Sequence, residues 1–243
     1  MIGRRYGRRR RNTATHDATP PAPPSQTPPL PSNAIEYWHS ELGVTPSVLI
    51  AGQIQGYQLF FFSAPTIAPD GVLFGGRDVM QSTTSGGKYF GNGSAFTLFA
   101  GSRPYMYVIG RYRTIPSADV WMSETGDHFG FTRFAVGCNA AGNLRGSFEG
   151  AFTTDGGADT GVHRFEAWFD GTNRNFRVDG SNTATADASQ NVACNAVGIG
   201  GSGAVGGSAS DSSVAFVLYC AAKPTDPEIA ALNAWATAYW GAP

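Results

Sequence analysis

The sequence has 243 residues and a formal net charge of −1, and it contains no apolar run of about 18 residues, so a membrane-spanning helix is excluded. Its 32 glycines, 12% aromatic residues and 14% charged residues are typical of a turn-rich β protein and argue against a helical one. The three cysteines, Cys138, Cys194 and Cys220, lack metal-ligand spacing, so we interpret them as small core residues, with at least one free thiol.

The basic residues are concentrated at the start of the chain. Residues 1–12 hold six arginines, which are Arg4, Arg5, Arg8, Arg9, Arg10 and Arg11. Residues 13–33 form a proline-rich spacer, and no apolar segment follows the arginines, so we expect no secretory signal. Without the six arginines, residues 13–243 carry 11 basic and 18 acidic side chains, a net charge of −7.

This charge separation predicts two parts with different partners. Residues 1–33 cannot form a core, because the arginines repel one another and the prolines lack a backbone donor. We therefore predict an extended arm over residues 1–33 and one folded domain over residues 34–243. Guanidinium groups bind phosphates and carboxylates, so the arm predicts an acidic partner, protein or nucleic acid.

After residues 34–46, which suit a short helix or an edge strand, the domain consists of short apolar runs. They cover residues 48–51, 57–62, 72–74, 96–99, 105–112, 120–122, 129–136, 144–148, 162–169, 176–178, 192–199 and 214–221. Turn pairs lie between them, the sharpest being Asn92-Gly93, Asp155-Gly156, Asp170-Gly171 and Asp179-Gly180. About a dozen short strands with such turns predict an all-β antiparallel sandwich or barrel.

One hairpin can be assigned residue by residue. Along residues 162–169, alternate positions place Phe165, Ala167 and Phe169 on one face and Arg164, Glu166 and Trp168 on the other. The turn at 170–173 leads to a return strand whose inward residues are Phe176 and Val178. This period of two predicts a sheet with one buried face.

The last element is the only helix that the sequence indicates clearly, at about 226–240. Thr225 or Asp226 suits its N-cap and Pro227 its first turn, and Gly241 ends it. The apolar side chains recur every three or four residues, at Ile229, Leu232, Trp235, Ala236 and Tyr239. One such stripe predicts a helix that packs onto the sheet.

The order of features from about residue 162 to the end resembles a known family. It comprises a strand from His163, the two Asp-Gly turns, the segment Val197–Gly201, a Gly/Ser loop over 202–213, a strand over 214–219 and the final helix. This order is similar to that of concanavalin A-like, laminin-G-like (lectin/glucanase) sandwich domains, and residues 68–76 resemble the entry segment of the same domains. Such domains are common in bacteriophage virion proteins, often after a short anchoring segment. The resemblance therefore implies a concanavalin A-like jelly roll with a structural or adhesive role.

The acidic residues do not favour an enzyme. Retaining glycosidases need two carboxyl groups about 5 Å apart, which suits an acid-x-acid spacing on one strand. Neither Glu124 with Asp127 nor Glu166 with Asp170 has this spacing. The loop aspartates form no dense calcium-binding run and the four histidines no cluster, so we expect no catalytic residue, no metal and no cofactor.

Exposed aromatic side chains could stack on sugars. The candidates for glycan contact are Trp121, Trp168, Tyr105 and Tyr112, and the alternative is that they fill the core or the interface between sheet and helix.

Taken together, these features predict a non-enzymatic bacteriophage virion protein, a capsid decoration or head spike, assembled in the host cytoplasm. Residues 4–11 would bind the major capsid protein or another virion protein, and the protein would form a homo-oligomer, with a trimer favoured. One alternative is a tail-associated adhesive module that binds a host-surface glycan. Another is a jelly-roll viral coat protein whose arm binds packaged genome, and a third is a secreted carbohydrate-binding or hydrolytic module.

Overall fold

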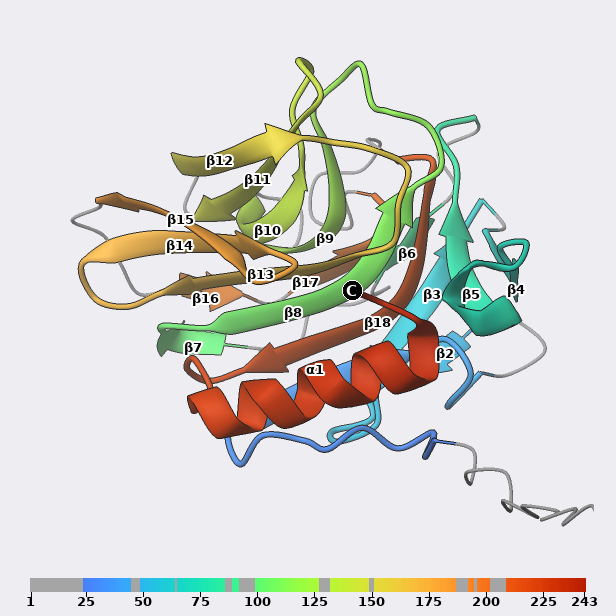
Figure 1. Cartoon of the computed structure of the whole chain (residues 1–243), viewed down its shortest axis with the longest axis horizontal. Helices are drawn as coiled ribbons and strands as arrows, with labels where there is room; N and C mark the ends of the chain where they lie inside the picture. The colour runs from blue at the N-terminus through green and yellow to red at the C-terminus, as the bar shows by residue number, and fades with distance from the viewer. Residues whose placement is uncertain are drawn as a thin grey trace, which may run out of the picture.

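The computed structural model describes residues 24–44, 49–63, 65–85, 89–91, 99–126, 132–148, 151–186, 192–194, 196–201 and 209–243. It confirms the all-β sandwich: two antiparallel sheets lie face to face, and the C-terminal helix covers one of them (Figure 1). The helix-side sheet has the order β15 (Ser181–Ala186), β14 (Asn173–Val178), β13 (His163–Phe169), β8 (Tyr105–Tyr112), β18 (Ser212–Cys220), β5 (Asp78–Ser82) and β4 (Thr66–Pro69).

The outer sheet has eight strands, and a small third sheet has two. The outer sheet has the order β12 (Ala151–Gly157), β11 (Asn143–Phe148), β10 (Thr132–Cys138), β9 (Val120–Gly126), β17 (Ala196–Ile199), β6 (Tyr89–Gly91), β3 (Gln58–Phe62) and β2 (Leu49–Ala51). The third consists of β16 (Val192–Cys194) and β7 (Phe99–Ser102). No helix among the described residues is long and apolar enough to cross a membrane.

Strand β18 is the centre of the helix-side sheet. Its whole length pairs with β8 on one side. On the other side, β1 (Ala34–His39) pairs with residues 216–220 and β5 pairs with residues 212–214. All nine residues of β18 are buried, because both of its faces are covered. This is why its sequence reads as a continuous apolar run rather than an alternating one.

Two hydrophobic cores lie on the two faces of the helix-side sheet. The inter-sheet core includes Phe134 of β10 together with Val217 and Tyr219 of β18. The helix-side core joins Phe216 and Leu218 to the buried stripe of the helix. Since alternate residues of β18 enter different cores, the strand couples the sandwich to the helix.

The predicted hairpin and helix are confirmed. Phe165, Ala167 and Phe169 enter the inter-sheet core, and Trp168 enters the helix-side core. The helix α1 runs over Asp226–Trp240 and begins with a capping box between Thr225 and Glu228. It ends at Gly241, whose φ of 67° is left-handed and therefore favours glycine.

Other local predictions need correction. Residues 72–74 do not form a strand but enter the 3-10 helix η1 (Leu73–Gly76), in which Phe74, Gly75 and Gly76 all have positive φ. Residues 34–39, left open between helix and strand, form β1. The run 192–199 contains two strands, β16 and β17, and five strands are additional to the predicted ones, namely β4, β5, β6, β12 and β15.

The end of the proline-rich spacer packs on the folded body. Figure 1 shows the segment before β1 running alongside α1, and we call residues 24–33 the strap. Pro28 and Pro31 are buried. The indole Nε1 of Trp235 donates to the Ser25 carbonyl at 2.8 Å, and the Ser32 amide donates to the Glu228 carboxylate at 2.8 Å. The body therefore holds the chain before the expected boundary at residue 33, while residues 1–23 lie outside the described part.

Candidate functional site

The predicted anchoring residues, Arg4, Arg5, Arg8, Arg9, Arg10 and Arg11, lie outside the described residues, so their role stays a prediction.

Three of the four predicted glycan contacts are wrong, because their side chains are buried. Tyr105, Tyr112 and Trp168 expose 0%, 1% and 4% of their surface. The Tyr105 hydroxyl donates to Glu166 at 2.7 Å, and burial raises the Tyr105 pKa well above its usual value. Trp168 points away from the inter-sheet core, as predicted, but that face carries the helix-side core rather than solvent.

The fourth residue, Trp121, lies half-buried on the outer face of the outer sheet. It lies over Gly137 of β10, where a Cβ atom would come within 2.6 Å of the indole. Its ring is stacked with that of Phe152, with centroids 6.2 Å apart, and the Arg145 guanidinium lies 4.3 Å from both centroids. Asp119 holds the same guanidinium in an ion pair at 3.2 Å. Phe152 remains 43% exposed, so this cluster presents an aromatic surface to solvent.

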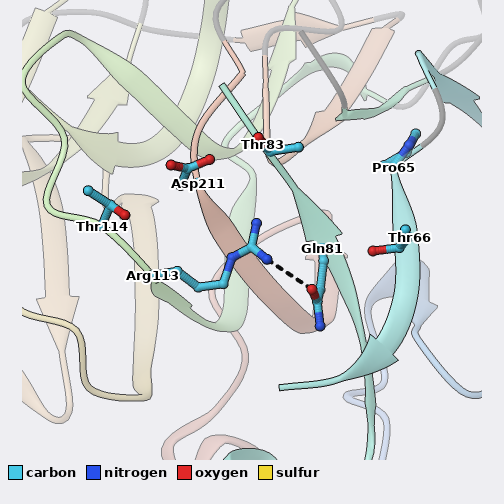
Figure 2. A pocket seen from close by; sticks show the side chains of 7 residues that line it. All are labelled: Pro65, Thr66, Gln81, Thr83, Arg113, Thr114 and Asp211. Atoms are coloured by element: carbon cyan, nitrogen blue, oxygen red, sulfur yellow. Dashed lines mark hydrogen bonds between the residues drawn. The ribbon is translucent and has the colours of Figure 1, made fainter. Parts of the chain in front are cut away.

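A polar pocket of about 460 Å³, here called the end pocket, lies where β4, β5, β8 and β18 meet (Figure 2). Its lining is rich in hydroxyl groups and consists of Pro65, Thr66, Gln81, Thr83, Arg113, Thr114 and Asp211. The volume lies within the range of small-molecule sites, roughly 300–1,000 Å³. The residues come from four segments, which the pairing of β4 with β5 and of β18 with β5 and β8 brings together.

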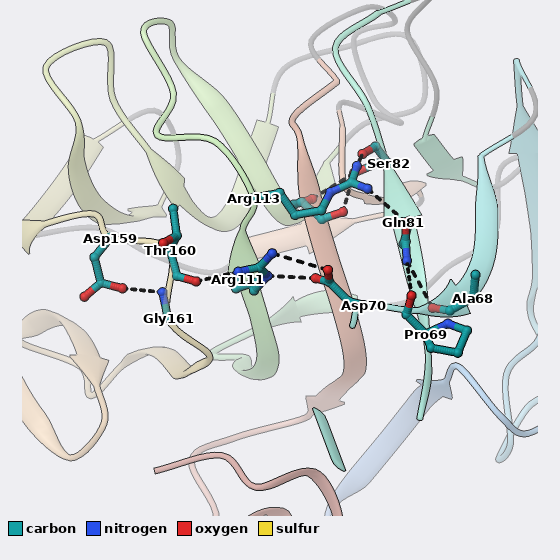
Figure 3. A network of polar contacts seen from close by, with 11 residues as sticks. Ala68, Pro69, Asp70, Gln81, Ser82, Arg111, Arg113, Asp159, Thr160 and Gly161 are labelled. Carbon is teal, nitrogen blue, oxygen red and sulfur yellow. Dashed lines mark hydrogen bonds and ion pairs between the residues drawn. The ribbon is translucent and has the colours of Figure 1, made fainter. Parts of the chain in front are cut away.

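Arg113 is fixed in one position on the wall of the end pocket. Its guanidinium donates to Gln81 Oε1 at 2.9 Å and to the carbonyl oxygen of Ser82. Gln81 is held in turn, because its amide donates to the carbonyl oxygens of Ala68 and Pro69, each at 3.1 Å (Figure 3). A donor locked in this way needs no rearrangement when a ligand binds.

Asp211 lines the end pocket beside Arg113. Its Oδ1 accepts from the amide of Thr84 at 3.0 Å, and its carbonyl oxygen accepts from the amide of Arg113 at 2.8 Å. Within the described part of the chain, Asp211 forms no ion pair with Arg113, and it is the only carboxylate in the lining. The pocket therefore offers one acid rather than the two that most glycoside hydrolases use.

An ion pair between Arg111 and Asp70 lies next to the end pocket (Figure 3). Arg111 Nε donates to Asp70 at 2.7 Å, and its Nη1 donates to the carbonyl oxygen of Thr160 at 2.7 Å. Burial alone would raise the pKa of Asp70, but the hydrogen bonds from Arg111 and the charges of Arg111 and Arg113 hold the pKa below the usual value. The Asp70 carboxylate is therefore ionised, and both of its oxygens accept hydrogen bonds from Arg111.

A second, smaller cavity of about 140 Å³ lies next to the end pocket. The two share Thr114 and Asp211 in their walls. The rest of the second cavity is more apolar, with Ile115, Pro116 and Val120 among its lining residues. The two cavities therefore adjoin at Thr114 and Asp211, one with a polar lining and one with a more apolar lining.

The acids considered for catalysis lie elsewhere. Glu166 is buried between Tyr105 and Arg177, and Asp170 caps its hairpin turn by accepting from the amides of Thr172 and Asn173. No group of three His, Cys, Asp or Glu side chains in the described ranges could hold a metal ion. Asp127 lies outside those ranges.

Comparison with known proteins shows likeness in fold only. No protein-family model matches the chain, and no curated protein matches it in sequence. Trypanosoma rangeli sialidase in complex with sialic acid has a TM-score of 0.60 and 11% identity over 84% of this chain and 33% of that chain. A mutant GH54 α-L-arabinofuranosidase has a TM-score of 0.59 and 9% identity over 89% of this chain and 61% of that chain.

A mutant of HCR D/C VPI 5995 has a TM-score of 0.57 and 7% identity over 84% of this chain and 52% of that chain. The chain thus spans less than two thirds of each of these structures. The shared feature is the β-sandwich, which agrees with the resemblance to concanavalin A-like domains at the level of fold. Two of the three are glycoside-cleaving enzymes by name, but fold likeness at such low identity transfers no activity.

No motif or spacing in the sequence predicts the end pocket. Thr66, Arg113 and Asp211 are far apart in the chain, and none belongs to a motif. Only the pairing of strands brings them together.

Proposed function

We propose that this protein is a non-enzymatic structural protein of a bacteriophage particle. Its basic arm anchors it to the particle and its β-sandwich is displayed outward. The observation that carries the proposal is the strap: hydrogen bonds at Ser25 and Ser32 fix the arm's last residues along α1, so the arm leaves a rigid body at a defined place.

From the start of the strap at Pro24, the arm is long enough to contact a distant surface. In an extended polyproline conformation, at about 3.1 Å per residue, Arg11 would lie on the order of 40 Å from Pro24. The six arginines would thus contact a surface well away from the sandwich. An acidic face of the major capsid protein or of another virion protein is the partner that this chemistry fits best.

A capsid decoration or head spike is the role that we favour, with several copies side by side. In a trimer, three arms would bind one assembly, and their combined avidity would far exceed the affinity of a single arm. The single pocket carboxylate Asp211 supports a binding module over a hydrolase.

The test is incorporation into particles. Phage is grown in cells that supply the full chain, a variant with Arg4, Arg5, Arg8, Arg9, Arg10 and Arg11 replaced by Gln, or one with the same six replaced by Lys. We expect the full chain in purified particles, the Lys variant at reduced occupancy and the Gln variant absent. Equal incorporation of the Gln variant, or a particle without this protein, would contradict the proposal.

Two outcomes of that experiment separate the alternatives. Emptied shells that have lost their nucleic acid should keep the protein; loss together with the genome would favour the coat protein whose arm binds packaged genome. The adhesive, tail-associated module is favoured by a different observation, the exposed aromatic surface of Trp121 and Phe152. Location on tails rather than heads in labelled particles would support it.

A further inference from the structure

Arg113 and Asp211 lie opposite each other at the end of the ladder between β8 and β18. The ladder pairs Tyr112 with Ser212, and the next bond joins the amide of Arg113 to the carbonyl oxygen of Asp211 at 2.8 Å. Residues placed in this way have Cβ atoms about 4.5–5.5 Å apart, and opposite charges there usually form a stabilising pair. Within the described part of the chain, however, these two side chains form no ion pair with each other.

Each of the two charges is held instead by a group on β5 or just after it. The Nη1 atom of Arg113 donates to Gln81 Oε1 at 2.9 Å, and its Nη2 atom donates to the carbonyl oxygen of Ser82. Asp211 Oδ1 accepts from the amide of Thr84 at 3.0 Å. Figure 2 shows the two charged groups apart, with the guanidinium turned toward Gln81. A ligand that binds between them therefore has no ion pair to break.

Both charged groups keep unused bonding capacity. One N–H on Nη1 and one on Nη2 of Arg113 have no partner among the described residues. In the same residues the Oδ2 atom of Asp211 accepts no hydrogen bond. Guanidinium N–H groups bind carboxylates, and carboxylate oxygens bind ammonium groups, in the strongest class of hydrogen bond. The end pocket is therefore equipped to bind both a negative and a positive group.

The paired charges select against ligands that carry only one sign. A simple anion would be attracted by Arg113 and repelled by Asp211, and a simple cation would meet the reverse. A ligand with a carboxylate and an ammonium group satisfies both side chains. Because Arg113 and Asp211 are neighbours across two strands, the two ligand groups must also be close together. An α-amino acid meets this requirement, since both of its charged groups are bonded to one carbon atom.

We propose that the end pocket binds a free α-amino acid with a polar side chain, as its zwitterion. The ligand carboxylate accepts from Nη1 and Nη2 of Arg113, and the ligand ammonium donates to Oδ2 of Asp211. The ligand side chain lies beside the hydroxyls of Thr66 and Thr114, which form no hydrogen bond within the described residues. This site goes beyond the proposed anchoring role, and it holds whether or not the arm attaches the protein to a particle.

Titration calorimetry of the full chain with free serine, threonine, asparagine and glutamine tests the site. Each amino acid is compared with its N-acetyl form, which lacks the ammonium group, and with its α-amide, which lacks the carboxylate. We expect at least one free amino acid to bind, and both of its blocked forms to bind about 10-fold or more weakly, because each loses a hydrogen bond between charged groups.

Two variants locate the binding in the end pocket. Asp211→Asn should weaken the free amino acid by about 10-fold or more but weaken its N-acetyl form less, because that form has no ammonium group for Asp211. Thr66→Trp, from an exposed position of β4, should fill the pocket and abolish binding. Matched controls are Asp155→Asn and Thr154→Trp on β12, which do not line the pocket and should bind as the full chain does. Thermal unfolding checks that each variant folds.

Three results would overturn the inference. They are that none of the four amino acids binds at millimolar concentration, that a blocked form binds as tightly as its free amino acid, or that Thr66→Trp binds unchanged. Because Thr66 is exposed, Thr66→Trp decides the matter even if Asp211→Asn does not fold.

Discussion

The indole Nε1 of Trp235 donates a 2.8 Å hydrogen bond to the carbonyl oxygen of Ser25, joining the last helix to the strap. The Asn33 side chain adds a bond to the carbonyl of Ala222 at 2.9 Å. Removing residues 1–23 should therefore leave the free energy of unfolding unchanged, whereas removing residues 1–33 should lower it by about 2 kcal/mol. Urea denaturation measures both, and equal stability of the two truncations would show that the strap adds nothing to the body.

A buried carboxylate organises the loop after β2. Glu36 is fully buried and accepts hydrogen bonds from the amides of Ile54 at 2.7 Å and Gln55 at 2.9 Å. A Cβ atom on Gly52 would clash with this carboxylate. Gly52→Ala should therefore destabilise the protein by about 2–3 kcal/mol in urea denaturation. Gly156→Ala, where a Cβ would meet nothing within 4 Å, is the matched control and should change stability by less than about 0.5 kcal/mol.

His163 should make the protein less stable in alkaline solution. Its Nδ1 lies 2.6 Å from Asp179 and its Nε2 lies 2.8 Å from Asp159, and these hydrogen bonds, that to Asp179 first, raise its pKa to about 8. The pKa of histidine in the unfolded chain is about 6.5, so between pH 6.5 and 8 the folded state binds more protons than the unfolded state. The stabilisation is complete below pH 6.5 and is lost as the pH rises through 8, with an amplitude of up to about 2 kcal/mol.

Urea denaturation across this range measures the effect. His163→Gln, which cannot titrate, should lose the fall in stability between pH 6.5 and 8. A variant with the same slope as the parent chain would assign the slope to another group.

His39 should make the protein less stable in acidic solution. It is fully buried among aromatic rings, including Trp240 with ring centroids 5.0 Å apart, and its Nδ1 accepts from the amide of Glu41. Burial, and then the charge of Arg77, lower its pKa to about 4. Since the unfolded pKa is higher, stability is present above pH 6.5 and is lost as the pH falls through 4, by at most about 3 kcal/mol.

The histidine C2 proton resonance gives a direct check on His39. It should titrate near pH 4 or not before the protein unfolds. A midpoint near 6.5 in the folded protein would contradict the burial argument.

The contribution of Arg145 to stability should depend on its guanidinium group and not only on its positive charge. It lies 4.3 Å from the ring centroids of both Trp121 and Phe152. Arg145→Lys should cost about 1 kcal/mol of stability, because lysine keeps the charge near Asp119 but cannot stack between two rings. Arg103→Lys, at an exposed position 5.6 Å from the Phe169 ring, should cost less. Equal effects in urea denaturation would show that the stacking adds little.

Sequence patterns predicted those elements whose apolar and polar side chains follow a clear pattern. The hairpin of β13 and β14 alternates apolar and polar residues, and β18 is apolar throughout, so both could be assigned. The strands that escaped prediction lack such patterns: β15 reads Ser-Asn-Thr-Ala-Thr-Ala and is a strand because it pairs with β14. The apolar run at Leu73 and Phe74 suggested a strand, but Phe74 serves a different purpose: its ring packs against that of Trp240.

The site was harder to predict than the fold. The alternation around Trp168 placed it correctly on the face opposite Phe165, but the sequence does not tell whether that face meets water or a helix. Thr66, Arg113 and Asp211 form a pocket only because β5 and β8 flank β18 and β4 pairs with β5. Such proximity is a property of strand order, which local patterns do not encode.

The pairing of β1 with residues 216–220 of β18 sets a condition on biosynthesis. A chain emerging from the ribosome presents β1 early, but its partner appears only after some 180 further residues have been translated. Until then the apolar residues of β1, Trp38 among them, have no sheet to join. Folding of this sandwich should therefore be largely post-translational and slow, as the long sequence separation of its central contacts requires.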